Sequence, residues 1–261
     1  MNKIIYDVEV DAYRALVSSE YEVEFSKDFW TYYCNHDEAK AAVNAEIERV
    51  QSIAPDHSLF LALGDSNNFR YSVYPSYKSN RRRYRRPPGH SRLKEWLCTT
   101  WPCLQLANVE GDDVVGNCAQ PGDIIVSKDK DLNTIPGLHV DVLTGEIYEV
   151  SKWEADINFY TQILTGDSAD GYPGCPKYGP KSAAKLLAGA TTENELWERV
   201  RGAYITAASK DPETPSVLTM ARCARILRMG EYDHENQRPF LWEPPMPSDP
   251  CMETFIPNFH D

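Results

Sequence analysis

The chain has 261 residues, of which 42% are hydrophobic, and its formal net charge is −12. This size allows one large domain or a core with a smaller appendage, and no apolar run approaches the roughly 20 residues of a membrane span. Seven scattered cysteines without a C-x-x-C pair indicate reduced thiols, not a disulfide framework or a zinc site. The N-terminus lacks an apolar signal region, so we expect a soluble protein of the cytoplasm.

Two apolar segments near the N-terminus predict buried strands that each end in an aspartate. The first covers residues 3–8 and contains Asp7, and the second covers residues 58–65 and ends at Asp65. Between them, residues 37–53 are rich in alanine and predict a helix. Strands that alternate with helices indicate an α/β fold with a mostly parallel sheet, in which sites form at the carboxyl ends of the strands.

A basic segment follows the second strand. Residues 66–94 contain nine lysines and arginines and no acidic residue. This composition is too polar for a core and predicts an exposed, partly helical arm, followed by a helix over residues 93–101. Arginines and lysines neutralise phosphates, and aromatic rings stack on unpaired bases, so the interleaved tyrosines favour nucleic-acid contact over a merely solubilising surface. These tyrosines are Tyr71, Tyr74, Tyr77 and Tyr84.

The segment 109–131 carries a dense group of carboxylates. It opens with Glu110, Asp112 and Asp113 at a predicted helix N-terminus. A short apolar strand, 124–126, then leads into Asp129-Lys130-Asp131, where a period of two would put both carboxylates on one side. Like charges held together cost energy unless a cation neutralises them. Carboxylate oxygens without histidine or cysteine select Mg²⁺ or Mn²⁺, so we predict a divalent cation site here.

The remaining segments predict a hairpin, several helices and an anion-binding turn. Residues 139–150 predict a hairpin that turns at Thr144-Gly145, and residues 153–164 predict a helix. Asp167 and Asp170 would then share a helix face at i, i+3. The Gly/Pro-rich stretch 171–184 would deliver a helix whose N-terminus favours an anion. Two further helices are predicted at 193–208 and 218–229, and an irregular, proline-rich tail is predicted from Gln237.

Taken in order, these motifs resemble the 5′-nuclease superfamily of flap endonucleases and 5′→3′ exonucleases, most closely the stand-alone phage exonucleases. The resemblance runs to about Leu187 and rests on Asp7 with Arg14, Gly64-Asp65, Arg70, Tyr77-Lys78-x-x-Arg81, Glu110-Gly111-Asp112-Asp113, Asp129-Lys130-Asp131, Gly166-Asp167-x-x-Asp170 and Gly174 to Ala183. Three positions depart from the usual pattern. Val8 replaces a glycine, Gly111 replaces the alanine of E-A-D-D, and Lys177 replaces the second glycine of the helix–hairpin–helix signature.

The resemblance implies a PIN-like fold, with a mostly parallel central sheet flanked by helices and a helical arch at about 71–96. The nuclease core would cover residues 1–158, and a helix–hairpin–helix DNA-binding subdomain with C-terminal helices would cover 159–261. The implied activity is metal-dependent 5′→3′ exonuclease and structure-specific flap endonuclease hydrolysis of DNA. It would use two or more Mg²⁺ or Mn²⁺ ions about 3.5–4 Å apart. RNA–DNA hybrids as a second substrate, K⁺ at the hairpin, a monomeric state and a role in phage DNA replication or recombination are further implications.

The resemblance also assigns roles to individual residues. Lys78 and Arg81 would stabilise charge on the scissile phosphate, Asp7 and Asp129 would belong to the catalytic centre, and Tyr77 would stack on the terminal base. The implied metal ligands are Asp7, Asp65, Glu110, Asp112, Asp113, Asp129, Asp131, Asp167 and Asp170. The implied nucleic-acid contacts are Arg70, Tyr77, Arg82, Arg83, Arg85, Arg86, Gly174, Lys177, Gly179, Lys181 and Ser182.

Two alternatives remain open at this point. A PIN-type ribonuclease could use the same sheet on RNA, although it gives no reason for the hairpin at Gly174. A non-catalytic DNA-binding module is the other alternative, and the complete carboxylate set argues against it.

Overall fold

The computed structural model describes residues 2–246, apart from the side chain of Arg82. Residues 247–261, with Cys251 and the end of the predicted tail, lie outside the described residues. The elements are β1 Lys3–Asp7, α1 Glu9–Ser18, β2 Glu20–Ser26, β3 Phe29–Cys34, α2 His36–Ile53, β4 Ser58–Leu63, α3 Arg70–Val73, η1 Ser79–Arg83, α4 His90–Thr100, β5 Cys103–Gln105, α5 Gly111–Cys118, β6 Ile124–Val126, η2 Lys130–Thr134, β7 Gly137–Val140, β8 Ile147–Val150, α6 Lys152–Thr165, α7 Pro180–Leu187, α8 Glu193–Ala208, α9 Val217–Ala224, β9 Tyr232–Asp233 and β10 Arg238–Pro239.

A six-stranded sheet with the order β5-β4-β1-β6-β7-β8 forms the centre of the fold. Every neighbouring pair is parallel except β7–β8, which the predicted hairpin at Thr144-Gly145 joins in antiparallel fashion. The prediction of a mostly parallel α/β sheet is therefore confirmed. Among the described residues, no helix is both long and apolar enough to cross a membrane.

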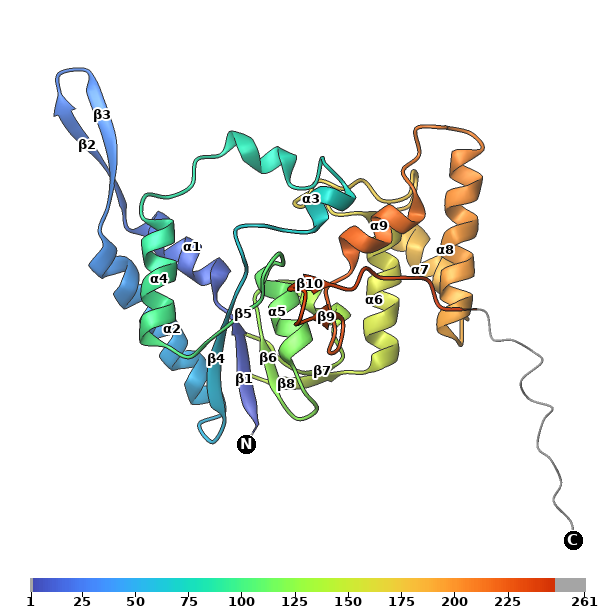
Figure 1. Ribbon diagram of the computed structural model, residues 1–261, viewed down its shortest axis with the longest axis horizontal. Helices are drawn as coiled ribbons and strands as arrows, with labels where there is room; N and C mark the ends of the chain where they lie inside the picture. Colours follow the sequence, from blue (N-terminus) through green and yellow to red (C-terminus); the bar gives the residue numbers. More distant parts are fainter. Residues whose placement is uncertain (1, 247–261) are drawn as a thin grey trace, which may run out of the picture.

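Helices cover both faces of the sheet (Figure 1). Alternation along β1 separates the two layers, because Ile4 and Tyr6 pack with α1, α2 and α4, whereas Ile5 packs with α5 on the other face. Gly64 follows β4 directly, and a Cβ there would lie 2.6 Å from the backbone nitrogen of Gly111. Only glycine permits this approach. It brings the acidic N-terminus of α5 to the end of the strand.

A second core is built from α6, α7, α8 and α9, with Trp242 packed among them. The chain after α9 then returns to the sheet domain, where Ile226, Leu227 and Tyr232 pack with α5. The predicted helix over 218–229 is therefore too long, since α9 ends at Ala224. The backbone becomes extended at Arg225, and the carbonyls of Cys223 and Arg225 accept hydrogen bonds from a buried arginine described below. A division at residue 158 stays a prediction.

The basic arm runs from α3 through η1 to α4 and passes over the sheet edge (Figure 1). It is partly helical, as predicted, because α3 and η1 are short and separated by turns. The segment β2–β3 before it is a long hairpin that the sequence analysis missed. This hairpin projects from the body of the molecule (Figure 1) and exposes aromatic side chains, among them Phe25, Phe29 and Trp30.

Lys177 adopts a left-handed backbone conformation with φ of 71°, at the position where the resemblance implies glycine. A side chain makes this conformation unfavourable, whereas glycine adopts it readily. We therefore expect Lys177→Gly to stabilise the fold by about 0.5–1 kcal/mol, seen as a rise in thermal midpoint of about 1–4 °C. Lys177→Ala is the control, because alanine keeps the Cβ. An equal gain from alanine would contradict this account.

Candidate active site

A cleft of about 1450 Å³ lies at the carboxyl ends of β1, β4 and β6. Seven of the nine predicted metal ligands line it, the exceptions being Asp113 and Asp167. Lys78, Arg81, Arg85 and Arg86 from the basic arm line the same cleft. The structure therefore brings the acidic groups and the basic arm to one place, as the sequence predicts.

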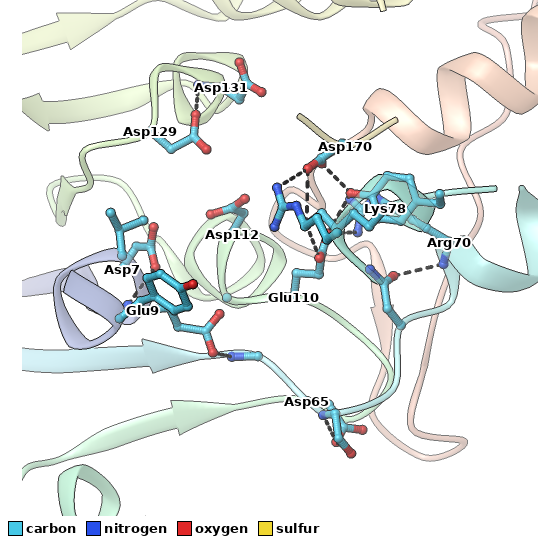
Figure 2. A pocket seen from close by; sticks show the side chains of 18 of the residues that line it. Asp7, Glu9, Asp65, Arg70, Lys78, Glu110, Asp112, Asp129, Asp131 and Asp170 are labelled. Carbon is cyan, nitrogen blue, oxygen red and sulfur yellow. Dashed lines mark hydrogen bonds and ion pairs between the residues drawn. The ribbon is translucent and has the colours of Figure 1, made fainter. Parts of the chain in front are cut away.

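Asp7, Asp112 and Asp129 face one another across the floor of the cleft (Figure 2). Asp7 is 3% exposed and accepts a hydrogen bond from Ser127 Oγ at 2.9 Å. Burial, followed by the charge of Glu9, raises the pKa of Asp7 to about 7. Burial and the charges of Asp7 and Asp129 also raise the pKa of Asp112 well above its usual range. A divalent cation would relieve this repulsion.

Asp131 lies beside Asp129, but the predicted alternation along a strand is not the reason. The strand β6 ends at Val126, and Asp129 instead caps η2, with its Oδ1 accepting from the backbone nitrogen of Asp131 at 2.9 Å. Gln162 donates a hydrogen bond to Asp131 Oδ2 at 2.8 Å. Burial, Asp129 and Asp167 together raise the pKa of Asp131 to about 7. Asp167 is thus coupled to this group although it does not line the cleft.

A lysine neutralises the other acidic pair. Lys78 Nζ contacts the carboxylate of Glu110 and lies 3.4 Å from Asp170 Oδ1, and Arg81 Nη2 donates to the same Asp170 oxygen at 2.7 Å. Asp167 and Asp170 do not share a helix face. They belong to a tight turn closed by the bridge between Asp167 and Tyr172, because glycines with positive φ flank it at positions 166 and 171.

The predicted stacking of Tyr77 on a terminal base is corrected by its burial. Its side chain is 1% exposed, and its ring packs against Tyr172 with centroids 6.3 Å apart. The hydroxyl donates to Glu110 Oε2 at 2.8 Å and to Asp170 Oδ2 at 2.6 Å, so it shares its hydrogen between two carboxylates. Tyr77 therefore positions these acids, whereas Tyr71 and Tyr84 of the arm have exposed rings.

Arg70 and Asp113 form a buried ion pair, which corrects the roles predicted for both. Arg70 is 2% exposed, so it cannot contact a nucleic acid. It donates to the two carboxylate oxygens of Asp113 at 2.6 and 2.8 Å and to the carbonyls of Cys223 and Arg225. Asp113 also accepts from the backbone nitrogens of Glu110 and Leu227. With its oxygens occupied and no exposed surface, Asp113 ties α5 to the C-terminal segment and is not a metal ligand.

Removing one partner of this pair should destabilise the protein strongly. Truncation of one member leaves an uncompensated buried charge, so we expect Arg70→Met to lower the free energy of unfolding by about 3–5 kcal/mol. Chemical denaturation measures this loss, and Arg83→Met is the control because Arg83 is exposed. Replacing both members, as in Arg70→Met with Asp113→Leu, should recover part of the lost stability. Equal stability of the Arg70→Met and control proteins would contradict the assignment.

Asp65 lines the cleft but is turned away from the other carboxylates (Figure 2). Its oxygens accept from the backbone nitrogens of Ser66 at 2.6 Å and Asn108 at 2.9 Å. These hydrogen bonds, first that from Asn108, lower the pKa of Asp65. Asp65 is an exposed cap of its own loop in this conformation, and its predicted place among the ligands is not observed.

The chemistry of the cleft fits a divalent cation, although its carboxylates do not yet surround one point. Within residues 2–246, no group of three or more His, Cys, Asp or Glu side chains is arranged to hold a metal ion. Burial first, and then the charges of neighbouring acids, raise the pKa values of Asp7, Asp112 and Asp131. Oxygen donors crowded in this way suit a hard divalent cation.

The other predicted nucleic-acid residues are spread over two regions. Arg85 and Arg86 line the cleft, Arg83 is exposed outside it, and the side chain of Arg82 is not described. Arg85 donates to both carboxylate oxygens of Glu20 on the hairpin, at 2.9 and 2.7 Å. The remaining five lie outside the cleft, around the start of α7, and are Gly174, Lys177, Gly179, Lys181 and Ser182.

Four residues at or beside the cleft were missed from the sequence. Glu9 and Lys94 line it at the Asp7 end, Gln162 lines it beside Asp131, and Ser127 bonds Asp7. Glu9 could have been found, because it follows the strand that ends in Asp7 by two positions. Gln162 could not, since nothing in a helical segment 31 residues beyond Asp131 indicates that the two side chains meet.

The sequence of the chain is similar to those of known exonucleases. A family model described as "5′-3′ exonuclease, N-terminal resolvase-like domain" matches residues 13–162. The exodeoxyribonuclease of Enterobacteria phage T3 is 26% identical, over 92% of this chain and 92% of that protein. The exonuclease of Escherichia phage T7 is 25% identical, over 92% of this chain and 93% of that protein.

The fold is also similar to that of a solved structure. The T5 D15 protein, co-crystallised with metal ions, superposes with a TM-score of 0.51 at 14% identity. The match covers 86% of this chain and 98% of the T5 chain. At this identity the likeness concerns the fold alone.

Proposed function

Because the chain belongs to the 5′–3′ exonuclease family with its N-terminal resolvase-like domain, we propose that it hydrolyses DNA phosphodiester bonds at 5′ ends and at flaps. The observation that carries this proposal is the cleft itself. Asp7, Asp112 and Asp129 lie in the same cleft as Lys78 (Figure 2), and Arg81 also lines it, so a strand of phosphates could contact both the basic groups of the arm and cations held by the acids. The setting would be phage DNA replication or recombination in the host cytoplasm.

The cleft supports divalent metal dependence through two groups of acids. Asp7, Asp112 and Asp129 would hold one ion, and Asp131 with Asp167 and Asp170 would support a second, directly or through water. Bound Mg²⁺ or Mn²⁺ supplies water activation and Lewis-acid stabilisation of the leaving oxygen. Glu110 would join either group once Lys78 moves from it toward the substrate.

The residues of the chain would perform the remaining tasks. Lys78 and Arg81 already lie at the acidic floor, where they can donate hydrogen bonds to the scissile phosphate as its charge increases. Tyr77 keeps Glu110 and Asp170 in place through its shared hydroxyl. Tyr71 and Tyr84 offer exposed aromatic faces along the arm, where unpaired bases could stack.

The region around the start of α7 would anchor the duplex without reading its sequence. Its backbone nitrogens and Lys181 suit phosphate oxygens, which position a duplex and do not specify bases. Gly179 N donates to Ser182 Oγ at 2.9 Å, so the turn is held in a defined conformation. A K⁺ ion bound at this turn would lie close to Lys177, whose side chain is also positively charged and whose backbone φ is positive.

The test is a panel of 5′-labelled flap, nicked, blunt and single-stranded DNA, incubated with Mg²⁺, with Mn²⁺ or with EDTA. We expect release of short 5′ products from the flap and nicked substrates with either metal and none with EDTA. Binding without cleavage in every metal would instead support the non-catalytic module.

An RNA–DNA hybrid and a single-stranded RNA complete the panel. Backbone recognition discriminates weakly between the two sugars, so we expect slower removal of RNA from the hybrid. Preferential cleavage of the single-stranded RNA would favour the PIN-type ribonuclease.

A further inference from the structure

The cleft contains a carboxylate that neither the motifs nor the proposed ligand groups use. We propose that Glu9, the second residue after Asp7, is a further carboxylate of the cation site. This inference rests on the proposed function and adds to it a residue through which the chain tunes its affinity for the metal. Glu9 begins α1, lines the cleft, and its side chain is 38% exposed.

The two oxygens of Glu9 have different surroundings. Oε1 accepts from the backbone nitrogen of Gly64 and from Lys94 Nζ, both at 3.1 Å. Oε2 accepts no hydrogen bond from residues 2–246. One oxygen thus fixes the orientation of the carboxylate, and the other is left with its lone pairs available toward the cleft, where Asp7 and Asp112 also lie (Figure 2).

The position of Glu9 Oε2 depends on a glycine. A Cβ on Gly111 would lie 3.1 Å from Glu9 Oε2 and 3.5 Å from Asp7 Oδ1. The oxygens of Glu9 and Asp7 therefore border the same point, the start of α5, where the helix dipole also favours negative charge. The φ of Gly111 is not in the left-handed region, so the backbone itself does not require glycine here. The nearest atoms that a side chain at position 111 would meet are those of Glu9.

Lys94 makes the additional negative charge tolerable before a cation arrives. Its Nζ contacts both the carboxylate of Glu9 and the backbone carbonyl of Gly64. Glu9 in turn accepts from the backbone nitrogen of Gly64, so the three residues are tied together. Glu9 and Asp7 both place an oxygen beside Gly111 at the start of α5, so a divalent ion near Asp7 would be attracted to both carboxylates.

The first experiment measures Mn²⁺ binding to the metal-free protein by calorimetry, without nucleic acid. We expect Glu9→Gln to weaken Mn²⁺ affinity about tenfold, in the range typical of residues that support metal ligands. Glutamine keeps the shape and the acceptor for Gly64 and Lys94, so the change is mainly one of charge. Glu146→Gln removes the same charge from an exposed position outside the cleft and should leave the affinity unchanged.

The second experiment tests whether Gly111 acts through Glu9. Gly111→Ala should weaken Mn²⁺ affinity in the wild-type background, because its Cβ displaces Glu9 Oε2. In a Glu9→Ala background the same substitution should cost nothing, since the space is then free. Unchanged affinity in Glu9→Gln, or equal losses from Gly111→Ala in both backgrounds, would overturn the proposal. If the wild type nevertheless cleaves DNA with Mg²⁺, either outcome would leave the proposed nuclease function intact.

Discussion

Lys78→Ala should lower the turnover of DNA cleavage by two to three orders of magnitude while substrate affinity changes only a few-fold. Lys78 Nζ is held between Glu110 and Asp170 at the floor of the cleft, where the scissile phosphate would lie. Removal of one preorganised donor to a developing charge typically costs about 10²–10³ in rate. Affinity should survive because, on the proposed function, contacts spread along the arm and the α7 region would supply most of the phosphate neutralisation.

The matched control is Lys210→Ala, which removes a lysine just after the end of α8. Lys210 is exposed and does not line the cleft, so its loss should leave turnover nearly unchanged. Single-turnover kinetics under saturating enzyme separate the chemical step from binding. If Lys78→Ala instead weakened binding as much as it slowed cleavage, Lys78 would be an ordinary phosphate contact and not part of the catalytic centre.

The order of strands and the convergence of the acids could be predicted because both depend on local patterns. Apolar runs that end in Asp7 and Asp65 are buried parallel strands, and parallel strands put their carboxyl ends on one edge. The short run before Asp129 joins the same sheet next to β1. Sequence order and strand burial are therefore enough to bring these segments to one cleft.

The partner of each charged side chain could not be predicted in the same way. Arg70 lies in a basic segment and resembles its exposed neighbours. It is nevertheless buried, because it pairs with Asp113, 43 residues further along the chain, and with backbone carbonyls of the C-terminal segment. Tyr77 is likewise one of several tyrosines until the helical core closes over its ring. Asp65 shows the same limit, since its orientation is decided by Asn108 and not by the strand that precedes it. Pairing across long sequence separations depends on tertiary packing.

The hairpin β2–β3 was missed for a different reason. Strand β2 alternates glutamates with aromatic and aliphatic residues, but almost every side chain of β2 and β3 is exposed, so the pattern does not mark a buried face. An isolated hairpin is only marginally stable. Here Arg85 helps to hold it, since its guanidinium lies 3.9 Å from the centre of the Tyr32 ring and bonds Glu20. The contact comes from the arm, which the local sequence of the hairpin cannot reveal.

Asp112→Asn should stabilise the metal-free protein and abolish cleavage. Asp112 is held among Asp7, Asp129 and Glu110, and its carboxylate accepts no hydrogen bond from residues 2–246. Asparagine keeps the shape and removes the repulsion, so we expect a gain of about 1 kcal/mol and a rise in thermal midpoint of about 2–4 °C. Turnover should fall by at least about two orders of magnitude, because a ligand of the activating ion is lost.

The pH dependence of the stability gained in Asp112→Asn separates relief of charge repulsion from improved packing. The pKa of Asp112 is raised in the folded state, so the cost of its charge is absent below the unfolded value of about 4 and increases as the pH rises. The difference in thermal midpoint between Asp112→Asn and wild type should therefore be larger at pH 8 than at pH 4.5. Mg²⁺ should reduce this difference in thermal midpoint, because it stabilises the wild type more than the variant. Asp56→Asn, at an exposed site outside the cleft, controls for net charge. A gap independent of both pH and Mg²⁺ would mean that repulsion at Asp112 is not what the cation relieves.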